Sequence, residues 1–136
     1  IGCNNFALYD GAEYYGTTCH YITKVVDAGK IISVKKFPIF PSDTVSSLLT
    51  RTYDFQLALF YEVFGKILKG EELPTSDENW SRKPTTRKDL NRLAAITLDM
   101  SQEEVQKRIK ATSYGDWQPK LKIGDFEFEY KNKEVL

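Results

Sequence analysis

One apolar stripe restricts the fold of this chain more than any other feature of its sequence. Its members recur three or four residues apart, the spacing that places side chains on one face of a helix. Residues 41–44 supply polar side chains that can cap the first turn, and Gly70 is suited to end the helix. The stripe therefore predicts one long helix with a single buried face. Its members are Val45, Leu48, Leu49, Tyr53, Leu57, Phe60, Phe64 and Ile67.

Two runs rich in aromatic and β-branched residues precede this helix. The first extends from Tyr14 to Ile22 and the second from Ile31 to Ile39, and such runs are typical of strands. The segment between them, residues 26–30, contains an Asp and a Gly, which favour a tight reversal of the chain. We therefore predict an antiparallel pair of strands.

The chain after the long helix predicts smaller elements. Residues 71–85 show no sustained periodicity, which indicates an irregular loop. Thr86 can cap a short helix, and Ser101 begins a capping box in which its side chain bonds forward and Glu104 bonds back. Residues 121–130 alternate apolar and charged side chains, so we predict a hairpin with one apolar face.

Composition excludes several classes of protein. The 136 residues are 41% hydrophobic and 28% charged, and 19 basic residues balance 19 acidic ones. A neutral chain has no broad positive field to attract nucleic acid, and its longest apolar stretch, 57–68, is too short and too charged to span a membrane. Cys3 and Cys19 fit no metal-ligand spacing, so we expect a reduced, cytoplasmic protein. Because the chain begins with Ile1 and not with Met, we expect a fragment of a longer protein.

The residues that could carry chemistry do not by themselves define a reaction. His20 is the single histidine, and a lone histidine on a strand is more often structural than catalytic. Asp27, taken alone, is best explained as a turn residue. A basic cluster in and after the predicted loop is either a solvated surface or an anion-binding edge. Its members are Arg82, Lys83, Arg87 and Lys88. The sequence contains no triad spacing, phosphate-binding glycine loop or metal-ligand constellation.

The order of motifs between residues 7 and 70 resembles the folate-dependent formyltransferase family. The segment Gly16–Ile22, with its Gly-Thr-Thr-Cys-His run, leads into Asp27-Ala28-Gly29 and then Ile31-Ile32, and residues 37–44 and 57–70 are similar to the strand and helix that follow. The resemblance implies an α/β fold. In it, residues 1–73 form the C-terminal part of a Rossmann-like catalytic domain, and residues 74–136 form a small subdomain with short helices and a hairpin.

The same resemblance implies a candidate active site. Asp27 matches the family's catalytic aspartate, and Val26, Asp27, Ala28 and Gly29 would bind the formyl donor, 10-formyltetrahydrofolate. The family's catalytic Asn and His lie N-terminal to the matched region, and neither Asn4 nor Asn5 has an accompanying histidine. We therefore expect these 136 residues to be inactive alone and to act with a missing N-terminal portion.

Three acceptors of the formyl group compete within the resemblance. The chains of glycinamide ribonucleotide enzymes end soon after the long helix, whereas this chain continues through a loop, two helices and a hairpin. Methionyl-tRNA formyltransferases need a basic surface to bind their RNA, and this neutral chain lacks one. The tail from Ile109 to Phe126 is similar to the branch that formylates nucleotide-linked amino sugars. That branch is favoured, with Trp80, Arg82 and Lys83 as substrate-binding residues, although a simple surface loop explains these three equally well.

A non-enzymatic role remains the alternative. A chain without the catalytic Asn and His could serve as a dimerisation or regulatory module. The apolar face of the predicted hairpin, which carries Phe126, Phe128 and Tyr130, would then contact a partner. In either case we expect a homodimer formed through this hairpin.

Overall fold

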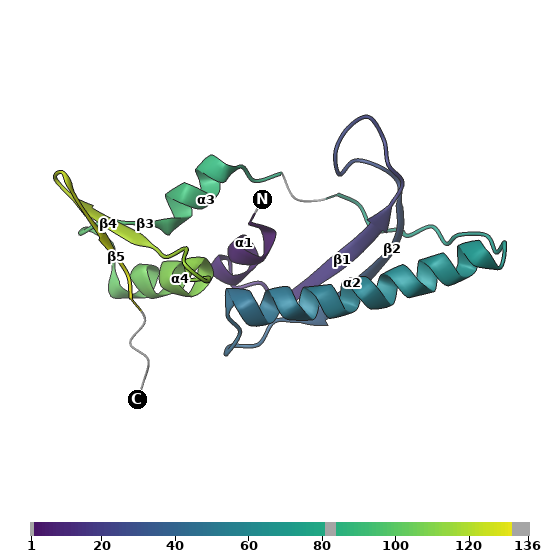
Figure 1. The fold of residues 1–136 in the computed structure, drawn as a ribbon, viewed down its shortest axis with the longest axis horizontal. Coiled ribbons are helices and arrows are strands. Elements are labelled where there is room, and N and C mark those ends of the chain that lie inside the picture. Colours follow the sequence, from purple (N-terminus) through teal and green to yellow (C-terminus); the bar gives the residue numbers. More distant parts are fainter. Residues whose placement is uncertain (1, 81–83, 132–136) are drawn as a thin grey trace. The chain divides into compact units, whose positions relative to one another are not determined.

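The computed structural model describes residues 2–80 and 84–131, and these form two compact units (Figure 1). Unit 1 contains residues 2–12, 40–48 and 84–131, and unit 2 contains residues 13–39 and 49–80. The chain therefore passes between the units more than once. The boundary expected after residue 73 stays a prediction about the complete protein.

Unit 2 is built on the predicted antiparallel pair. Strand β1, Tyr14–His20, pairs with β2, Ile31–Pro38, from Tyr14 opposite Pro38 to Thr18 opposite Val34, and the register shifts between Cys19 and His20. Within the described residues β1 pairs with β2 alone. The prediction of an antiparallel pair is confirmed.

The irregular segment after the long helix lies beside β2. The backbone N–H of Ser76 donates to the carbonyl of Ile31 at 3.2 Å, and Lys36 forms an ion pair with Glu78. Leu73 packs against the core of unit 2. Residues 71–80 contain neither helix nor strand, as predicted, but they are held against the sheet by these contacts.

Helix α2, Val45–Leu68, is the predicted long helix. The buried Asp43 holds its beginning, since one carboxylate oxygen accepts from the N–H of Phe40 at 2.7 Å and the other accepts from the Ser47 hydroxyl at 2.8 Å. Gly70 ends the helical run in the left-handed conformation, with φ of 68°, which glycine adopts without strain. No helix within residues 2–80 and 84–131 combines the length and hydropathy needed to cross a bilayer.

The buried face of α2 differs from the predicted one. Val45 and Leu48 are buried as predicted, but unit 2 packs its core cluster from Ile32 against Leu59 and Val63. The remainder of the predicted stripe beyond Leu49 is exposed, and that part of the prediction is wrong for the described residues. The helix has two apolar faces, and the β1–β2 pair covers only one. We call the other the open face of α2: Tyr53, Leu57, Phe60, Phe64 and Ile67.

Unit 1 combines three short helices with a small sheet. Its helices are α1, Cys3–Tyr9; α3, Arg87–Ala94; and α4, Gln102–Thr112. Its strands are β3, Ala95–Ile96; β4, Lys120–Ile123; and β5, Phe126–Glu129, in the order β3-β4-β5. The α3 and α4 helices and the β4–β5 hairpin were predicted from sequence, whereas the two-residue β3 was not.

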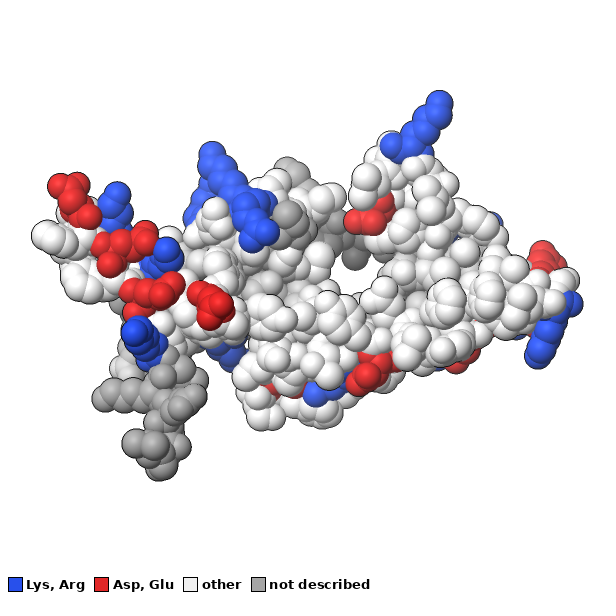
Figure 2. All heavy atoms as spheres, in the orientation of Figure 1, with Lys and Arg blue, Asp and Glu red and all other residues white. Residues whose placement is uncertain are grey.

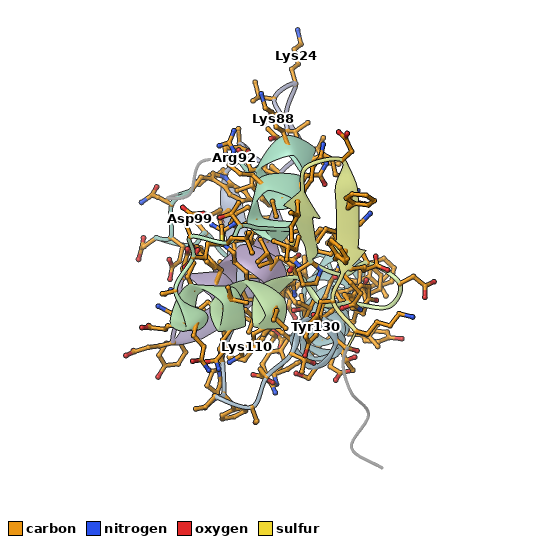
Figure 3. All side chains as sticks on the ribbon, turned by 90° about the vertical axis from the view of Figure 1, so that its left-hand side faces the viewer. Lys24, Lys88, Arg92, Asp99, Lys110 and Tyr130 are labelled. Atoms are coloured by element: carbon orange, nitrogen blue, oxygen red, sulfur yellow. The ribbon has the colours of Figure 1, made fainter. Side chains whose placement is uncertain are left out.

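Two side chains join the helices of unit 1. The amide of Asn5 on α1 donates to the backbone carbonyl of Ala111 on α4 at 2.7 Å, and both residues are buried. Lys110, labelled in Figure 3 on α4, donates to the carbonyl of Pro41 at 2.8 Å. Asn5 is therefore a packing residue of unit 1.

The predicted capping is complete at α3 and only partly formed at α4. Thr86 and Asp89 form a complete capping box at α3. At α4, Ser101 accepts from the N–H of Glu104 as predicted, but the Glu104 carboxylate accepts from the Tyr9 hydroxyl at 2.8 Å and from Arg108 Nε at 2.6 Å. The predicted bond from Glu104 back to the cap is replaced by these two contacts, because a phenol and a guanidinium are stronger donors.

Candidate active site

The candidate site is the loop that joins β1 to β2, residues 21–30 (Figure 1). The N–H of Tyr21 donates to the carbonyl of Lys30 at 3.0 Å and closes the loop at its base. At its tip, the hydroxyl of Thr23 donates to the carbonyl of Val25 at 2.8 Å. Asp27 has a φ of 51°, the left-handed conformation that Asp and Asn adopt more readily than most residues. The sequence therefore places a carboxylate on a sharply turned loop.

The Asp27 carboxylate lies beside the ring of His20. Its Oδ1 is 3.7 Å from His20 Nε2, which is an ion-pair distance and too long for a hydrogen bond. His20 Nδ1 lies 2.9 Å from the carbonyl of Tyr21, and because a carbonyl only accepts, this nitrogen carries the proton of a neutral ring. Nε2 then presents a lone pair when the ring is neutral and a positive N–H when the ring is protonated.

Trp80 holds the other side of the loop. Its indole N–H donates to the carbonyl of Gly29 at 2.8 Å, and its ring meets His20 edge to face at 4.9 Å between centroids. A Cβ on Gly29 would lie 1.6 Å from the carbonyl oxygen of Tyr21, so no other residue fits there without moving the backbone. His20, Gly29 and Trp80 therefore form one clamp at the base of the loop.

The structure brings together some of the predicted site residues. Val26, Asp27 and Ala28 lie on the exposed part of the loop, and Gly29 is buried at its base. The Asp27 side chain is 65% exposed and that of His20 is 22% exposed.

The structure describes one of the three predicted substrate-binding residues, Trp80. Trp80 contacts the Asp27 loop directly, a contact that the sequence did not predict because 51 residues separate it from Gly29. Arg82 and Lys83 lie outside the described residues. Arg87 and Lys88 of the same basic cluster belong to α3 in unit 1, where Figure 3 labels Lys88.

Two cavities in unit 1 are separate from this loop. The smaller, of about 260 Å³, is lined by Phe6, Tyr9, Thr85, Asp89, Arg92, Leu93 and Arg108. The larger, of about 480 Å³, lies between α3, β3 and the β4–β5 hairpin. None of the predicted site residues lines either cavity.

The exposed carboxylate can accept a proton or orient a partner that donates one. A carboxylate held on a turned loop beside a histidine is an arrangement that general acid and base catalysis uses. The described residues contain no group of three His, Cys, Asp or Glu side chains placed to hold a metal ion. The loop therefore supplies one ionisable pair, Asp27 and His20.

In fold, the chain is similar to N-formyltransferases. All of the chain matches 56% of a sugar N-formyltransferase from Shewanella, with a TM-score of 0.79 and 19% identity. In a second comparison, 82% of the chain matches 41% of an N-formyltransferase from Helicobacter canadensis, solved with folinic acid and dTDP-3-aminofucose, with a TM-score of 0.67 and 24% identity. The predicted α/β fold is confirmed by these likenesses.

The amino-acid sequence of the chain is also similar to formyltransferases. Residues 2–64 match the family model described as Formyl transferase. The phosphoribosylglycinamide formyltransferase of Haemophilus influenzae is 31% identical over 70 residues, which are 50% of this chain and 31% of that protein. The methionyl-tRNA formyltransferase of Levilactobacillus brevis is 23% identical over 109 residues, 79% of this chain and 34% of that protein. Over residues 2–64, somewhat less than half of the chain, the sequence is therefore similar to the formyl transferase family.

The chain is shorter than the proteins it resembles. It spans about a third of the length of both curated relatives and little more than half of the Shewanella structure. The resemblance stated from the Gly-Thr-Thr-Cys-His and Asp-Ala-Gly motifs is thereby confirmed for the family and the fold. The activity of the complete protein is a matter for proposal.

Proposed function

We propose that this chain is the C-terminal part of an enzyme that transfers a formyl group from 10-formyltetrahydrofolate to the amine of a nucleotide-linked amino sugar. The single observation that carries the proposal is the Asp27 carboxylate beside His20, on a loop within the segment that matches the family model. In this reaction the formyl carbon forms a bond to the acceptor nitrogen as its bond to the folate nitrogen breaks, and the amine loses one proton while the released folate nitrogen gains one.

Asp27 is the residue suited to handle that proton. Its carboxylate is exposed on the loop, so an acceptor amine or a bridging water can reach it. His20 lies beside it, with its Nε2 3.7 Å from Oδ1 of the carboxylate. Asp27 thus binds and orients the attacking group, and His20 is a positioning residue.

The loop also fits the formyl donor, which supplies the activated one-carbon group when it binds. A pterin ring carries both hydrogen-bond donors and acceptors, and the backbone of Val26, Asp27 and Ala28 is exposed toward solvent. The clash that a Cβ at Gly29 would make shows that the loop returns tightly over Tyr21. The fit is supported by the Helicobacter canadensis structure, which was solved with folinic acid.

The amino-sugar acceptor is favoured over transfer RNA for two reasons. The Helicobacter canadensis neighbour is described in complex with dTDP-3-aminofucose, and the Shewanella neighbour is described as a sugar N-formyltransferase. In addition, the 19 basic residues are balanced by 19 acidic ones, and on the face that Figure 2 displays the described residues carry charges of both signs, whereas a phosphate backbone calls for a broad basic area. A methionyl-tRNA acceptor is the competing assignment.

Formyl transfer by the complete protein tests the proposal. Asp27→Asn should lower kcat about a hundredfold or more, since proton transfer by one positioned group contributes on this scale. Asp125→Asn, at the exposed turn of the β4–β5 hairpin, is the matched control and should leave kcat unchanged. An Asp27→Asn enzyme with full activity would remove Asp27 from the site, and activity on methionyl-tRNA alone would select the competing acceptor.

A homodimer through the β4–β5 hairpin is proposed with this function. The register places Leu121 opposite Phe128 and Ile123 opposite Phe126, so these apolar side chains share one face. Phe126, Phe128 and Ile123 are exposed on it. Sedimentation of the chain should show a dimer that Phe128→Asp dissociates and Glu129→Ala does not. A monomer at high concentration would contradict the hairpin interface.

A further inference from the structure

The larger cavity of unit 1 lies on the polar face of the β4–β5 hairpin. Lys122 and Glu127 are paired across the two strands and both line the cavity, whereas Leu121 and Phe128 are paired on the opposite, apolar face. Successive side chains of a strand point to opposite faces of a sheet. Figure 1 shows α3 and β3 beside this hairpin, and residues of both also line the cavity. The cavity and the proposed dimer surface therefore use different side chains of the hairpin.

The cavity has the size and the lining of a site for a small polar molecule. Its volume is about 480 Å³, within the range of pockets that bind small ligands. Its less exposed lining is apolar, since Ala94 is buried and Ile96 and Trp117 are partly buried. Asn91 and Thr97 are exposed and add an amide and a hydroxyl. A molecule that fits this lining has one apolar surface and several groups that form hydrogen bonds.

The side chain of Gln118 gives an independent indication of a ligand. Its Nε2 donates to the carbonyl of Gly115 at 2.8 Å, but its Oε1 is buried and has no hydrogen-bond partner in the described part of the chain. A buried amide oxygen without a donor is destabilising and is uncommon in folded proteins. Because Gln118 lines the cavity, a ligand there that carries a hydroxyl group can supply the donor.

The charges of the cavity favour an uncharged ligand. Lys120 Nζ lies 2.7 Å from Glu127 Oε1, so the charges of these two side chains are paired with each other. Among the described residues no carboxylate pairs with Lys122. Phosphate and diphosphate groups are bound by several charged donors, whereas this lining offers one unpaired ammonium group and a carboxylate that repels anions. Side chains that both donate and accept are better matched to the hydroxyl groups of a sugar.

We propose that this cavity is a carbohydrate site that binds one neutral pyranose unit. The apolar face of the pyranose stacks on the ring of Trp117, and one of its hydroxyl groups donates to Gln118 Oε1. Asn91 and Lys122 donate to its other oxygen atoms. The lining contains no residue of the Asp27 loop, so this site is additional to the acceptor site of the proposed function and does not depend on formyl transfer.

Titration of the complete protein with methyl β-glucopyranoside, followed by NMR, tests the site. The probe should bind with a Kd on the order of 1 mM, the scale for a ligand of its size, and should shift the side-chain amide resonances of Asn91 and Gln118 together. Trp117→Ala should weaken binding about tenfold and Gln118→Leu about fivefold, whereas Trp117→Phe keeps an aromatic face and should retain most of the affinity. Lys131→Ala, at an exposed position after β5, is the matched control and should bind like the parent protein.

The position of the bound sugar decides between this cavity and the acceptor site. Asp27→Asn should bind the pyranoside as tightly as the parent protein, because Asp27 belongs to the other unit. Binding that Asp27→Asn abolishes and Gln118→Leu keeps would place the sugar at the acceptor site and overturn the proposal.

Three further results would overturn the carbohydrate site. One is the absence of binding well above the millimolar range, and another is full affinity in Gln118→Leu, which tests the site even where Trp117→Ala does not fold. The third is uridine diphosphate binding that is tighter than pyranoside binding and is weakened by Lys122→Ala, since the cavity would then be an anion site. Circular dichroism of each variant should match that of the parent protein.

Discussion

The Asp27 loop of unit 2 and the Glu104 contacts of unit 1 both place a carboxylate beside a basic side chain, but they differ in how far each is satisfied. Glu104 is 29% exposed and accepts hydrogen bonds of 2.6 Å and 2.8 Å from Arg108 and Tyr9. Asp27 is 65% exposed and lies 3.7 Å from His20. A carboxylate enclosed by its own chain stabilises the fold, whereas one left open is accessible to a substrate.

The electrostatics of unit 1 agree with a structural role. The hydrogen bond from Arg108, with a second from Tyr9, lowers the pKa of the Glu104 carboxyl below its ordinary value. The hydrogen bond that the Tyr9 hydroxyl donates to Glu104 also raises the pKa of that hydroxyl above its ordinary value. Arg108 also donates to the carbonyls of Arg92 and Ala95 at 2.9 Å, where α3 ends. One guanidinium thus joins α1, α3 and α4.

The largest effect should follow from removing that guanidinium. Arg108→Met should destabilise unit 1 by about 3 kcal/mol, because Glu104 and two helix-terminal carbonyls lose a charged donor together. Thermal or urea unfolding measures the change. Lys107→Met, which loses only an exposed ion pair with Glu103, is the control and should cost less than about 0.5 kcal/mol. An equal loss of stability in the two variants would mean that the contacts of Arg108 stabilise unit 1 no more than an exposed ion pair does.

A methyl group at Gly29 should open the clamp of the Asp27 loop. Gly29→Ala forces the loop away from Tyr21 and should cost about 2 kcal/mol, the scale of an overpacked site. Amide exchange in residues 21–30 should accelerate, and formyl transfer by the complete protein should fall. Gly65→Ala on α2 meets no atom within 4 Å and should instead stabilise the helix by about 0.5 to 1 kcal/mol.

The pH dependence of stability distinguishes Glu104 from other carboxylates. Because its pKa is lower in the folded chain, its contribution is complete above the ordinary value of 4.5 and is lost as the pH falls through the folded value. Wild-type Tm should therefore decrease more between pH 6 and pH 3 than the Tm of Glu104→Gln. Glu103→Gln should keep the wild-type slope. If the Tm of all three proteins decreased equally with pH, Glu104 would not be the source of the pH dependence.

The smallest effect on stability is expected at Asp27. Asp27→Asn should change the free energy of unfolding by less than about 0.5 kcal/mol, since the carboxylate is exposed and Asn also adopts the left-handed conformation. Chemical denaturation of the chain measures this change. A loss of 2 kcal/mol or more would show that Asp27 holds the loop, and the comparison with Glu104 would fail.

Local sequence patterns predicted most of the secondary structure. The run from Tyr14, the run from Ile31 and the helix after Thr44 form as expected, because β-branched content, turn residues and caps act over a few neighbouring positions. The same is true of Thr86, whose capping box is complete. The two-residue β3 escaped prediction, since it forms only because β4 pairs with it.

The candidate site was predictable in part. The motif around Asp27 and Gly29 identified the loop through its resemblance to the family, and residues 2–64 match that family. The contacts of Trp80 with Gly29 and His20 were not predictable, because no local pattern joins residues so far apart. Its indole N–H could equally have been paired with water.

The sequence by itself determined which segments become helix and strand, and it placed a carboxylate in the turn between two strands. Only the tertiary structure decided which of the two apolar faces of α2 is buried, because periodicity records that a face is apolar and not which surface covers it. Leu59 is buried because Ile32 lies against it, and Phe60, one residue further, is exposed because nothing in the described part of the chain covers it.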